Sequence, residues 1–412
     1  MTDFYTGSPM EPEDLWFRDA FIDGLWEILR GEHVILSAPR RTGKTSVMDH
    51  LAARPREGFS PVSVFVQDLD HPNEFLLTLL DAFHAKHPNL FRKVFQSTGS
   101  WIGKALDRLE EVEVAGFKIA LRKQLPSGPE GWKEFGDQQF FALARGTDCK
   151  LLFIVDEFPD LIVNMRKNHP ELVRPFLSWL RGHCVNPRPK QDNLRWLLGG
   201  SVNLSSTLDS LNALDLINAF HEESLPVLTV SQVEEFVTRM LSERGVEFDQ
   251  QVPRRVADLL GRPVPYFLQM ITQSLYRVWR RNQHRLVPVD VEHCFADLIV
   301  NSAARDKLQH FYSRIQQYYD EPKRSAAYEL LARLSVSDDG VSRSTLQQHF
   351  DRVLQEQGVT VPEYERRQLF NQLLRDLEND FYISELSSDT PDDSRYDFAS
   401  GLLKSWWKKY YA

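Results

Sequence analysis

Residues 33–52, HVILSAPRRTGKTSVMDHLA, decide the fold of this chain. The stretch begins with a short apolar run, His33–Ala38, that is typical of a strand buried on both faces. It ends in a run with helical periodicity, and the turn between the two carries Gly43, Lys44 and Thr45. A strand, a Gly-Lys-Thr turn and a helix in this order predict a phosphate-binding loop.

The chemistry of such a loop assigns a role to each part of the turn. Backbone amides at a helix N-terminus curl around phosphate oxygens, because the helix dipole favours anions there. Lys44 is expected to place its charge on the β- and γ-phosphates, and the Thr45 hydroxyl to complete the shell of a Mg²⁺ ion. Ala38 stands where the pattern G-x-x-x-x-G-K-[ST] has its first glycine, which requires a negative φ at Ala38. The predicted phosphate-binding residues are Ala38, Pro39, Arg40, Arg41, Thr42, Gly43, Lys44, Thr45 and Ser46.

Two adjacent carboxylates end another apolar run, LLFIVDEFPD at residues 151–160. Asp156 is suited to hold Mg²⁺ together with Thr45, and Glu157 is suited to orient or deprotonate an attacking water. Taken alone, an Asp-Glu pair after a strand can equally cap the N-terminus of a helix. Because this pair lies downstream of a phosphate-binding loop with helices between, we favour the catalytic interpretation.

A further apolar run, LRWLLGGSVNLSS, brings polar residues to a strand end. Ser201 and Asn203 are candidates to sense the γ-phosphate or its water, which would add them to Lys44 and Glu157 in the catalytic set. The other interpretation is a tight turn at Gly199-Gly200 whose hydroxyl caps the next helix. The residues leave both interpretations open.

Apolar strand-like runs alternate with helical runs over the first two thirds of the chain, which is the pattern of a parallel sheet covered by helices. After Val230 the pattern is almost wholly helical, and the last 90 or so residues give helix, helix, helix and hairpin, a winged-helix pattern. The predicted domains are 1–230, 231–318 and 319–412, and a small hairpin is predicted around Ala115-Gly116. The predicted strands are His33–Ala38, Pro61–Leu69, Lys150–Phe158, Leu194–Val202 and Ser224–Val230.

Composition excludes several classes of protein. With 42% hydrophobic and 26% charged residues over 412 positions, the chain matches an ordinary globular protein of more than one domain. It has no run of about 18 apolar residues and no N-terminal signal pattern, so we expect neither a spanning helix nor secretion. Three scattered cysteines fit a reducing compartment, and the net charge of −9 gives no global reason to bind nucleic acid or an anionic membrane. We therefore expect a cytoplasmic protein without a membrane partner.

These motifs together resemble the archaeal and bacterial P-loop ATPases of the AAA+/STAND-like superclass, essentially from end to end. APRRTGKTS (38–46) is similar to the family's PRR-x-GKTS loop, VDEFPDLI (155–162) to its Walker B strand, and LLGGSVN (197–203) to its sensor strand. Arg18 stands at a position similar to the arginine of the family's F-x-R-E segment, which lies over the nucleotide. PYFLQM (265–270) resembles the lid box G-x-P-Y-x-L-Q with Pro263 in place of its glycine, and in such proteins the proline matching Pro265 lies near the adenine.

The resemblance implies an α/β P-loop NTPase fold with a parallel sheet of order 5-1-4-3-2, a helical lid over 231–318 and a C-terminal winged helix. It implies ATP or ADP with Mg²⁺ rather than GTP, since the sequence has no Asn-Lys-x-Asp guanine motif. An ATP-dependent homo-oligomer is compatible with it. Arg181 and Arg195 are candidates to reach a neighbouring subunit's γ-phosphate, or they are surface ion-pair partners.

The winged helix raises the question of DNA, which charge does not favour. Residues 321–412 carry 12 Lys/Arg against 16 Asp/Glu, whereas sequence-independent DNA binding needs an excess of basic residues. The C-terminal KSWWKKYYA can stack on bases, or its aromatic residues at helical spacing can pack a terminal helix onto its own domain. We favour packing, and a protein partner over DNA.

Three functions remain as hypotheses. The first is an Mg·ATP-dependent ATPase that acts as a switch on a protein or nucleic-acid partner, with Glu157 aligning the water. The second is an adaptor or regulator that binds ATP without hydrolysing it. The third is a winged-helix DNA-binding regulator, which predicts an affinity for duplex DNA that falls with salt.

Overall fold

The computed structural model describes residues 4, 10–11, 15–38, 41–97, 131–185, 193–200, 204, 208, 211, 213–300, 302–386 and 394–412. The chain forms two compact units. The core unit comprises residues 10–38 and 44–225, and the C-terminal unit comprises 226–412 together with residues 1–9 and 39–43. Among the helices of the described part, none combines the length and apolarity that a membrane crossing requires.

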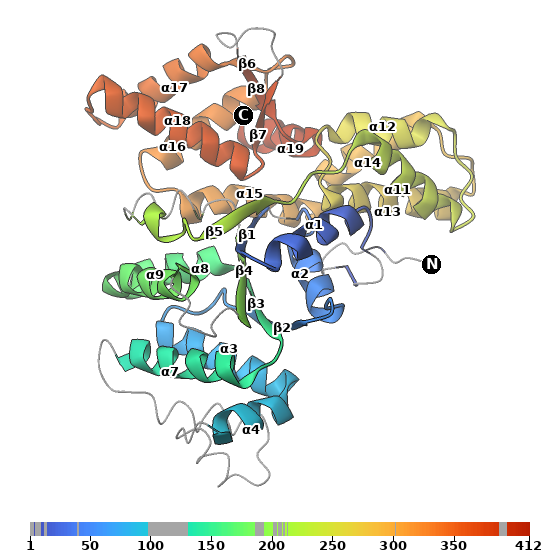
Figure 1. Ribbon diagram of the computed structural model, residues 1–412. Helices are drawn as coiled ribbons and strands as arrows, with labels where there is room; N and C mark the ends of the chain where they lie inside the picture. The colour runs from blue at the N-terminus through green and yellow to red at the C-terminus, as the bar shows by residue number, and fades with distance from the viewer. Residues whose placement is uncertain are drawn as a thin grey trace. The chain divides into compact units, whose positions relative to one another are not determined.

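The core unit is built on a five-stranded parallel sheet (Figure 1). Its strands are β1 (His33–Ser37), β2 (Phe59–Phe65), β3 (Lys150–Asp156), β4 (Leu194–Gly200) and β5 (Phe220–Ser224). Their order is β2-β3-β4-β1-β5, which confirms the predicted order 5-1-4-3-2. Since every pair is parallel, the carboxyl ends of β1, β3 and β4 meet at one edge of the sheet, where the predicted site residues follow.

Helices cover both faces of this sheet, because alternate residues of the central strands point to opposite sides. Leu152 and Ile154 of β3 pack with α1 (Asp19–Leu29) and α2 (Lys44–Ala53) in one buried cluster. Leu151, Phe153 and Val155 belong to the cluster on the other face. The helices of that second layer are α3 (Pro72–Lys86), α4 (Pro88–Ser97), α7 (Gly131–Gly146), α8 (Phe158–Asn168) and α9 (Pro170–Val185).

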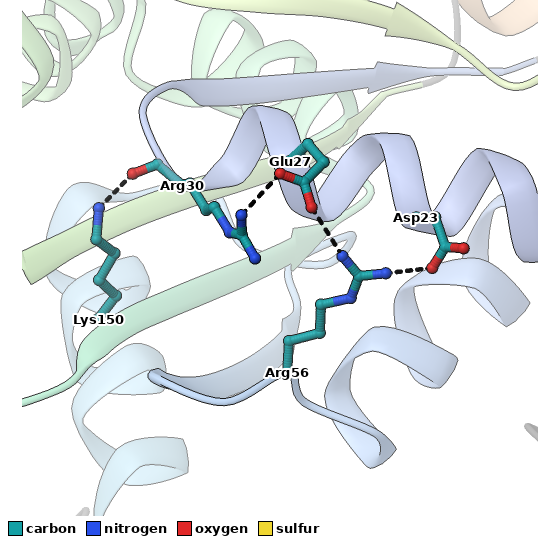
Figure 2. A network of polar contacts seen from close by, with 5 residues as sticks. All are labelled: Asp23, Glu27, Arg30, Arg56 and Lys150. Atoms are coloured by element: carbon teal, nitrogen blue, oxygen red, sulfur yellow. Dashed lines mark hydrogen bonds and ion pairs between the residues drawn. The ribbon is translucent and has the colours of Figure 1, made fainter.

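An ion-pair network fastens α1 to the sheet at the end away from the predicted site (Figure 2). Arg56, which precedes β2, pairs with Asp23 and Glu27, one helical turn apart on α1. Glu27 also pairs with Arg30 at 2.8 Å. The carbonyl oxygen of Arg30, at the negative end of the helix dipole, accepts a hydrogen bond from the Lys150 ammonium at the start of β3.

The C-terminal unit begins with a group of four helices and continues into the winged helix (Figure 1). The first group is α11 (Val230–Ser242), α12 (Gln251–Leu260), α13 (Pro265–Asn282) and α14 (Pro288–Val300), which form the helical lid. The helix α15 (Ser302–Tyr318) follows it. A turn of 3₁₀-helix, Leu214–Leu216, lies in the core unit before β5.

The winged helix matches the predicted order of elements. It consists of α16 (Lys323–Ser335), β6 (Val341–Ser342), α17 (Arg343–Glu356), α18 (Glu363–Asn379), β7 (Ile383–Leu386), β8 (Arg395–Phe398) and α19 (Gly401–Tyr411). The hairpin β7-β8 was predicted, and β6 adds a third antiparallel strand beside β8. Trp406 and Trp407 are fully buried, which supports the interpretation that α19 packs onto its own domain.

One predicted strand is wrong. The apolar stretch 224–230 was predicted as the fifth strand, but β5 is Phe220–Ser224, FHEES. As an edge strand it pairs with β1 alone and tolerates polar side chains, so apolar content was the wrong criterion. The residues after it instead begin α11, where Thr229 and Gln232 form a capping box. The hairpin predicted around Ala115-Gly116 lies outside the described residues.

Candidate nucleotide-binding site

The predicted loop leaves β1 in a backbone conformation suited to its role. The amide of Ala38 donates to the carbonyl of Gly200 at 3.3 Å, so the first loop residue continues the contact between β1 and β4. Ala38 is not among the described residues with positive φ, which meets the condition for an alanine at the first glycine position. Gly43 has φ +98°, a conformation that side chains rarely adopt, and it directly precedes the helix α2.

Lys44 and Thr45, at the start of α2, both reach Asp156 at the end of β3. The Thr45 hydroxyl donates to Asp156 Oδ2 at 2.7 Å, and the Lys44 ammonium pairs with Asp156 Oδ1. Lys44 and Asp156 are both buried, so this pair is shielded from water. The hydroxyl and the carboxylate are oxygen ligands of the kind that Mg²⁺ prefers. The lysine beside them supplies the positive charge that binds a phosphate. The donor set therefore fits Mg²⁺ with a phosphate.

The absence of a side chain at Gly199 on β4 leaves space for the Asp156 carboxylate. A methyl group at Gly199 would lie 2.7 Å from Asp156 Oδ1 and 2.7 Å from Met48 Sδ. Both distances are far below normal contact, so no larger residue fits without displacing a neighbour. The next glycine, Gly200, would meet only Pro159 Cγ at 3.5 Å. The two adjacent glycines thus differ: only Gly199 is required by the site.

Glu157 occupies a strained position directly after Asp156. Its φ of +57° and ψ of +38° are left-handed, and it stands at the N-cap of α8 without a side-chain cap hydrogen bond. Its backbone amide donates to Asp156 Oδ1 at 2.9 Å. A non-glycine residue in this region costs about 1–3 kcal/mol and is found most often at functional sites. The capping interpretation of Glu157 therefore receives no support from its side chain.

A second carboxylate lies near Asp156 on α2. Burial raises the pKa of Asp49, and the negative charges of Asp156 and Glu11 raise it further. Near these residues, the Ser46 hydroxyl accepts a hydrogen bond from the Met10 amide at 2.9 Å. The site therefore holds an excess of negative charge that a bound cation would relieve.

The remaining predicted residues fall into three groups. Arg18 is buried in the core unit, and burial lowers the pKa of its guanidinium to about 10. In the C-terminal unit, Pro265 opens the helix α13, and Arg41, with φ +68°, lies with its guanidinium 4.1 Å from the ring centroid of Tyr266. Thr42 is buried. The predicted residues Pro39, Arg40, Ser201 and Asn203 lie outside the described residues.

Both arginine-finger candidates lie in the core unit, where they donate hydrogen bonds within the chain. Arg195 is buried near the amino end of β4, opposite to the loop, and donates to the carbonyls of Leu194 and Arg30. Arg181 on α9 donates to Asn218 Oδ1 at 3.0 Å. Arg195 is therefore a structural residue of the sheet.

Sequence reasoning missed two residues of the site, Gly199 and Asp49. Gly199 and Gly200 were included in a predicted strand, with a tight turn left open as an alternative, and the structure places both in β4; a steric requirement for Gly199 was not predicted. Asp49 follows Thr45 by four residues on α2, which places both on one helical face, and this spacing was the available signal.

Comparisons with known proteins show a similarity of fold. No protein-family model and no curated protein matches the sequence. Among solved structures, the Walker-type ATPase PABY2304 of Pyrococcus abyssi is 16% identical and matches over 98% of this chain and 99% of its own, with a TM-score of 0.62. This chain has a P-loop ATPase fold. The ORC2 protein of Aeropyrum pernix, in its ADPNP–ADP complexes, is 13% identical over 96% of this chain and 92% of its own, with a TM-score of 0.51. Both likenesses extend over the whole P-loop ATPase fold rather than the loop alone.

Proposed function

We propose that this protein is an Mg-dependent ATPase that acts as a nucleotide-driven switch on a protein partner. One observation carries the proposal: at the carboxyl edge of the sheet, the side chains of Lys44 and Thr45 both lie within hydrogen-bond distance of Asp156. The two whole-length structural neighbours support it, since one is a Walker-type ATPase and the structure of the other is a complex with adenine nucleotides.

Each residue has a role that follows from its chemistry. The amides around Gly43 and the Lys44 ammonium would bind the β- and γ-phosphates. Thr45 and Asp156 would hold Mg²⁺, which supplies charge for the phosphate oxygens when bound. Glu157 would orient the attacking water and accept its proton. In the C-terminal unit, Pro265 and Arg41 are proposed to contact the nucleotide, as is Arg18 in the core.

Two substitutions test nucleotide binding and hydrolysis separately. Lys44→Ala should weaken ATP binding about 10- to 100-fold, because it removes a charge-assisted contact of about 1.5–3 kcal/mol. Lys167→Ala, at an exposed lysine of α8, is the matched control and should bind like the unaltered protein. Glu157→Gln should keep the affinity within about twofold and lower turnover at least ~100-fold.

The outcomes separate the hypotheses. Equal turnover in Glu157→Gln and the unaltered protein would remove Glu157 from the mechanism. Unchanged ATP binding in Lys44→Ala would contradict the assignment of residues 38–46 as a phosphate-binding loop. Tight ATP binding with turnover at background, also in the presence of the partner, would instead support an adaptor that holds nucleotide without hydrolysing it.

A protein partner is favoured over DNA because arginines of the winged helix form ion pairs within the domain. On α18, Arg366 pairs with Asp351 at 3.5 Å and Arg367 pairs with Glu363. Charges that are already neutralised release few counterions from DNA phosphates. The connection between β7 and β8 carries three aspartates and no Lys or Arg, namely Asp389, Asp392 and Asp393.

Affinity capture with Glu157→Gln, which should hold ATP, tests the partner class. We expect a protein to be retained in ATP and released in ADP. A titration of duplex DNA at low salt is the counter-test: binding whose logarithm falls steeply with log salt would overturn the protein assignment in favour of DNA.

A further inference from the structure

The lid and the winged helix meet along a tight backbone contact. A Cβ atom at Gly401, the first residue of α19, would overlap the carbonyl oxygen of Leu259 on α12. Next to it, Gly261 and Ser400 form an antiparallel bridge, and Gly261 has φ +68°. The main chains of two elements about 140 residues apart therefore touch without an intervening side chain.

The turn after α12 extends this contact into the wing sheet. The Arg262 amide donates to the Ala399 carbonyl at 3.0 Å, and the Ala399 amide donates to the Tyr382 carbonyl at 2.9 Å. The Arg262 guanidinium lies 5.3 Å from the ring centroid of Phe381, which precedes β7. The lid turn is thus hydrogen-bonded to the same backbone segment that continues the wing hairpin.

The helix α15, which follows the lid, is fixed to the winged helix by buried polar groups. The Tyr382 hydroxyl donates to the Phe311 carbonyl at 2.6 Å. The Tyr319 hydroxyl, just beyond α15, donates to Asp380 Oδ2 at 2.9 Å, and Arg314 lies 3.7 Å from Asp380 Oδ1. These side chains are buried. Groups that pair in a low-dielectric interior are costly to separate, because each partner would be left unpaired.

The terminal helix α19 adds a third set of contacts. The ring of Tyr411 stacks on that of Tyr312 of α15 with centroids 4.0 Å apart, and its hydroxyl donates to Gln309 at 2.7 Å. The Tyr410 hydroxyl donates to the Ile299 carbonyl of α14 at 3.3 Å. The end of the chain therefore contacts both α14 and α15.

We propose that the lid and the winged helix are a single rigid body, so that the winged helix moves wherever the lid moves. A winged helix tethered by a flexible hinge would show polar, loosely packed contacts instead of overlapping backbones and buried hydrogen bonds. The functional consequence rests on the proposed function: the nucleotide state that sets the lid would then set the winged helix directly. If the bound nucleotide changes the affinity of the winged helix for a partner by some factor, the bound partner must change the affinity for that nucleotide by the same factor, because linkage is reciprocal.

Distances between paired spin labels test rigidity in the full-length protein. Arg277→Cys on α13 and Gln348→Cys on α17 report the distance from lid to winged helix, in a background in which Cys149 and Cys184 are serine. We expect one narrow distribution that is the same without nucleotide, with ADP and with Mg·ATP. A broad distribution, or one that shifts with nucleotide, would overturn the rigid body.

A second label pair keeps this test separate from the proposed function. Lys167→Cys on α8 with Arg277→Cys reports the distance from core to lid. If the core-to-lid distance is the same with and without nucleotide while the lid-to-winged-helix distribution stays narrow, the proposed switch is contradicted and the proposed rigid body is supported.

Gly401→Ala breaks the contact directly. Its methyl group must push α19 away from the Leu259 carbonyl, so the lid-to-winged-helix distribution should broaden or shift. Gly182→Ala, at a glycine with nothing within 4 Å of an added Cβ, is the control and should leave it unchanged. Tyr382→Phe, which removes one hydroxyl and retains the ring, serves if Gly401→Ala does not fold, and it should raise amide exchange in α15 at least ~3-fold. Unchanged distances in Gly401→Ala, or unchanged exchange in Tyr382→Phe, would contradict the proposal.

Discussion

Gly199→Ala adds one methyl group beside the proposed metal carboxylate, and the structure gives the size of the collision. The methyl carbon would lie 2.7 Å from Asp156 Oδ1, whereas normal contact needs about 3.4 Å or more. One of the two groups must therefore move by about 0.7 Å. Met48, whose Sδ is equally close, is unbranched and can turn aside. The Asp156 carboxylate has less freedom, because Thr45, Lys44 and the Glu157 amide all hold it.

The expected cost has two parts. Overpacking of this kind lowers the free energy of unfolding by about 1–3 kcal/mol. A displaced Asp156 also weakens its hydrogen bond to Thr45, and a hydrogen bond to a charged group is worth about 1.5–3 kcal/mol. If Mg²⁺ is held by Thr45 and Asp156, the Mg-dependent part of ATP affinity should fall about 10- to 100-fold.

Titration of a fluorescent ATP analogue, with Mg²⁺ and with EDTA, measures this part alone. Gly200→Ala is the matched control, since its methyl group meets only Pro159 at ordinary contact distance and should bind like the unaltered protein. A Gly199→Ala protein that folds and retains the full gain in affinity on adding Mg²⁺ would refute the reasoning. It would show that Asp156 does not have to hold its position for Mg²⁺ to bind.

Three further predictions concern stability. Asp49→Asn should raise the Tm by about 1–3 °C at pH 7 in EDTA. The pKa of Asp49 is raised in the folded protein, so its charged form destabilises the fold once the pH rises through the ordinary carboxyl range. An unchanged Tm would contradict an excess of negative charge at the site. Arg56→Ala should cost about 0.5–1 kcal/mol at low salt and less in 1 M NaCl, measured by urea unfolding, and a loss independent of salt would contradict an ionic origin. The pKa of His71, which caps α3, is lowered by burial and by His169, so the folded protein takes up this proton less readily than the unfolded chain. Thermal stability should therefore fall as pH drops below about 6.5, and less in His71→Asn, which retains a capping side chain; equal slopes would contradict this.

Most strands of the sheet could be predicted from the sequence because each buried strand left a local signal, whereas their order came from the resemblance to the ATPase family. The strands β1, β3 and β4 are short apolar runs, of which β3 ends in a carboxylate and β4 in a glycine, and those patterns do not depend on the rest of the chain. The strand β5 left no such signal, because only Phe220 of FHEES is buried at this edge of the sheet. Its place follows only from pairing with β1, which the sequence does not state.

The site could be predicted only in part for the same reason. Lys44, Thr45 and Asp156 were named from motifs, and the fold brings them together. The requirement for Gly199 depends on which atoms approach a strand from the side, and the position of Arg195 at the far end of its strand depends on the sheet direction. Both are properties of contacts between distant segments, which local patterns do not contain.

If the site binds Mg·ATP as proposed, the pairing of Lys44 with Asp156 couples the binding of nucleotide to the binding of metal. Both groups are buried, and each neutralises the other. ATP alone would draw Lys44 towards its phosphates and leave Asp156 as an uncompensated buried charge, a situation that costs about 3–5 kcal/mol when one partner of a buried pair is removed. Mg·ATP supplies both replacements at once, an anion for the lysine and a cation for the carboxylate. The excess of negative charge around Asp49 acts in the same direction, so the site should bind Mg·ATP with higher affinity than free ATP.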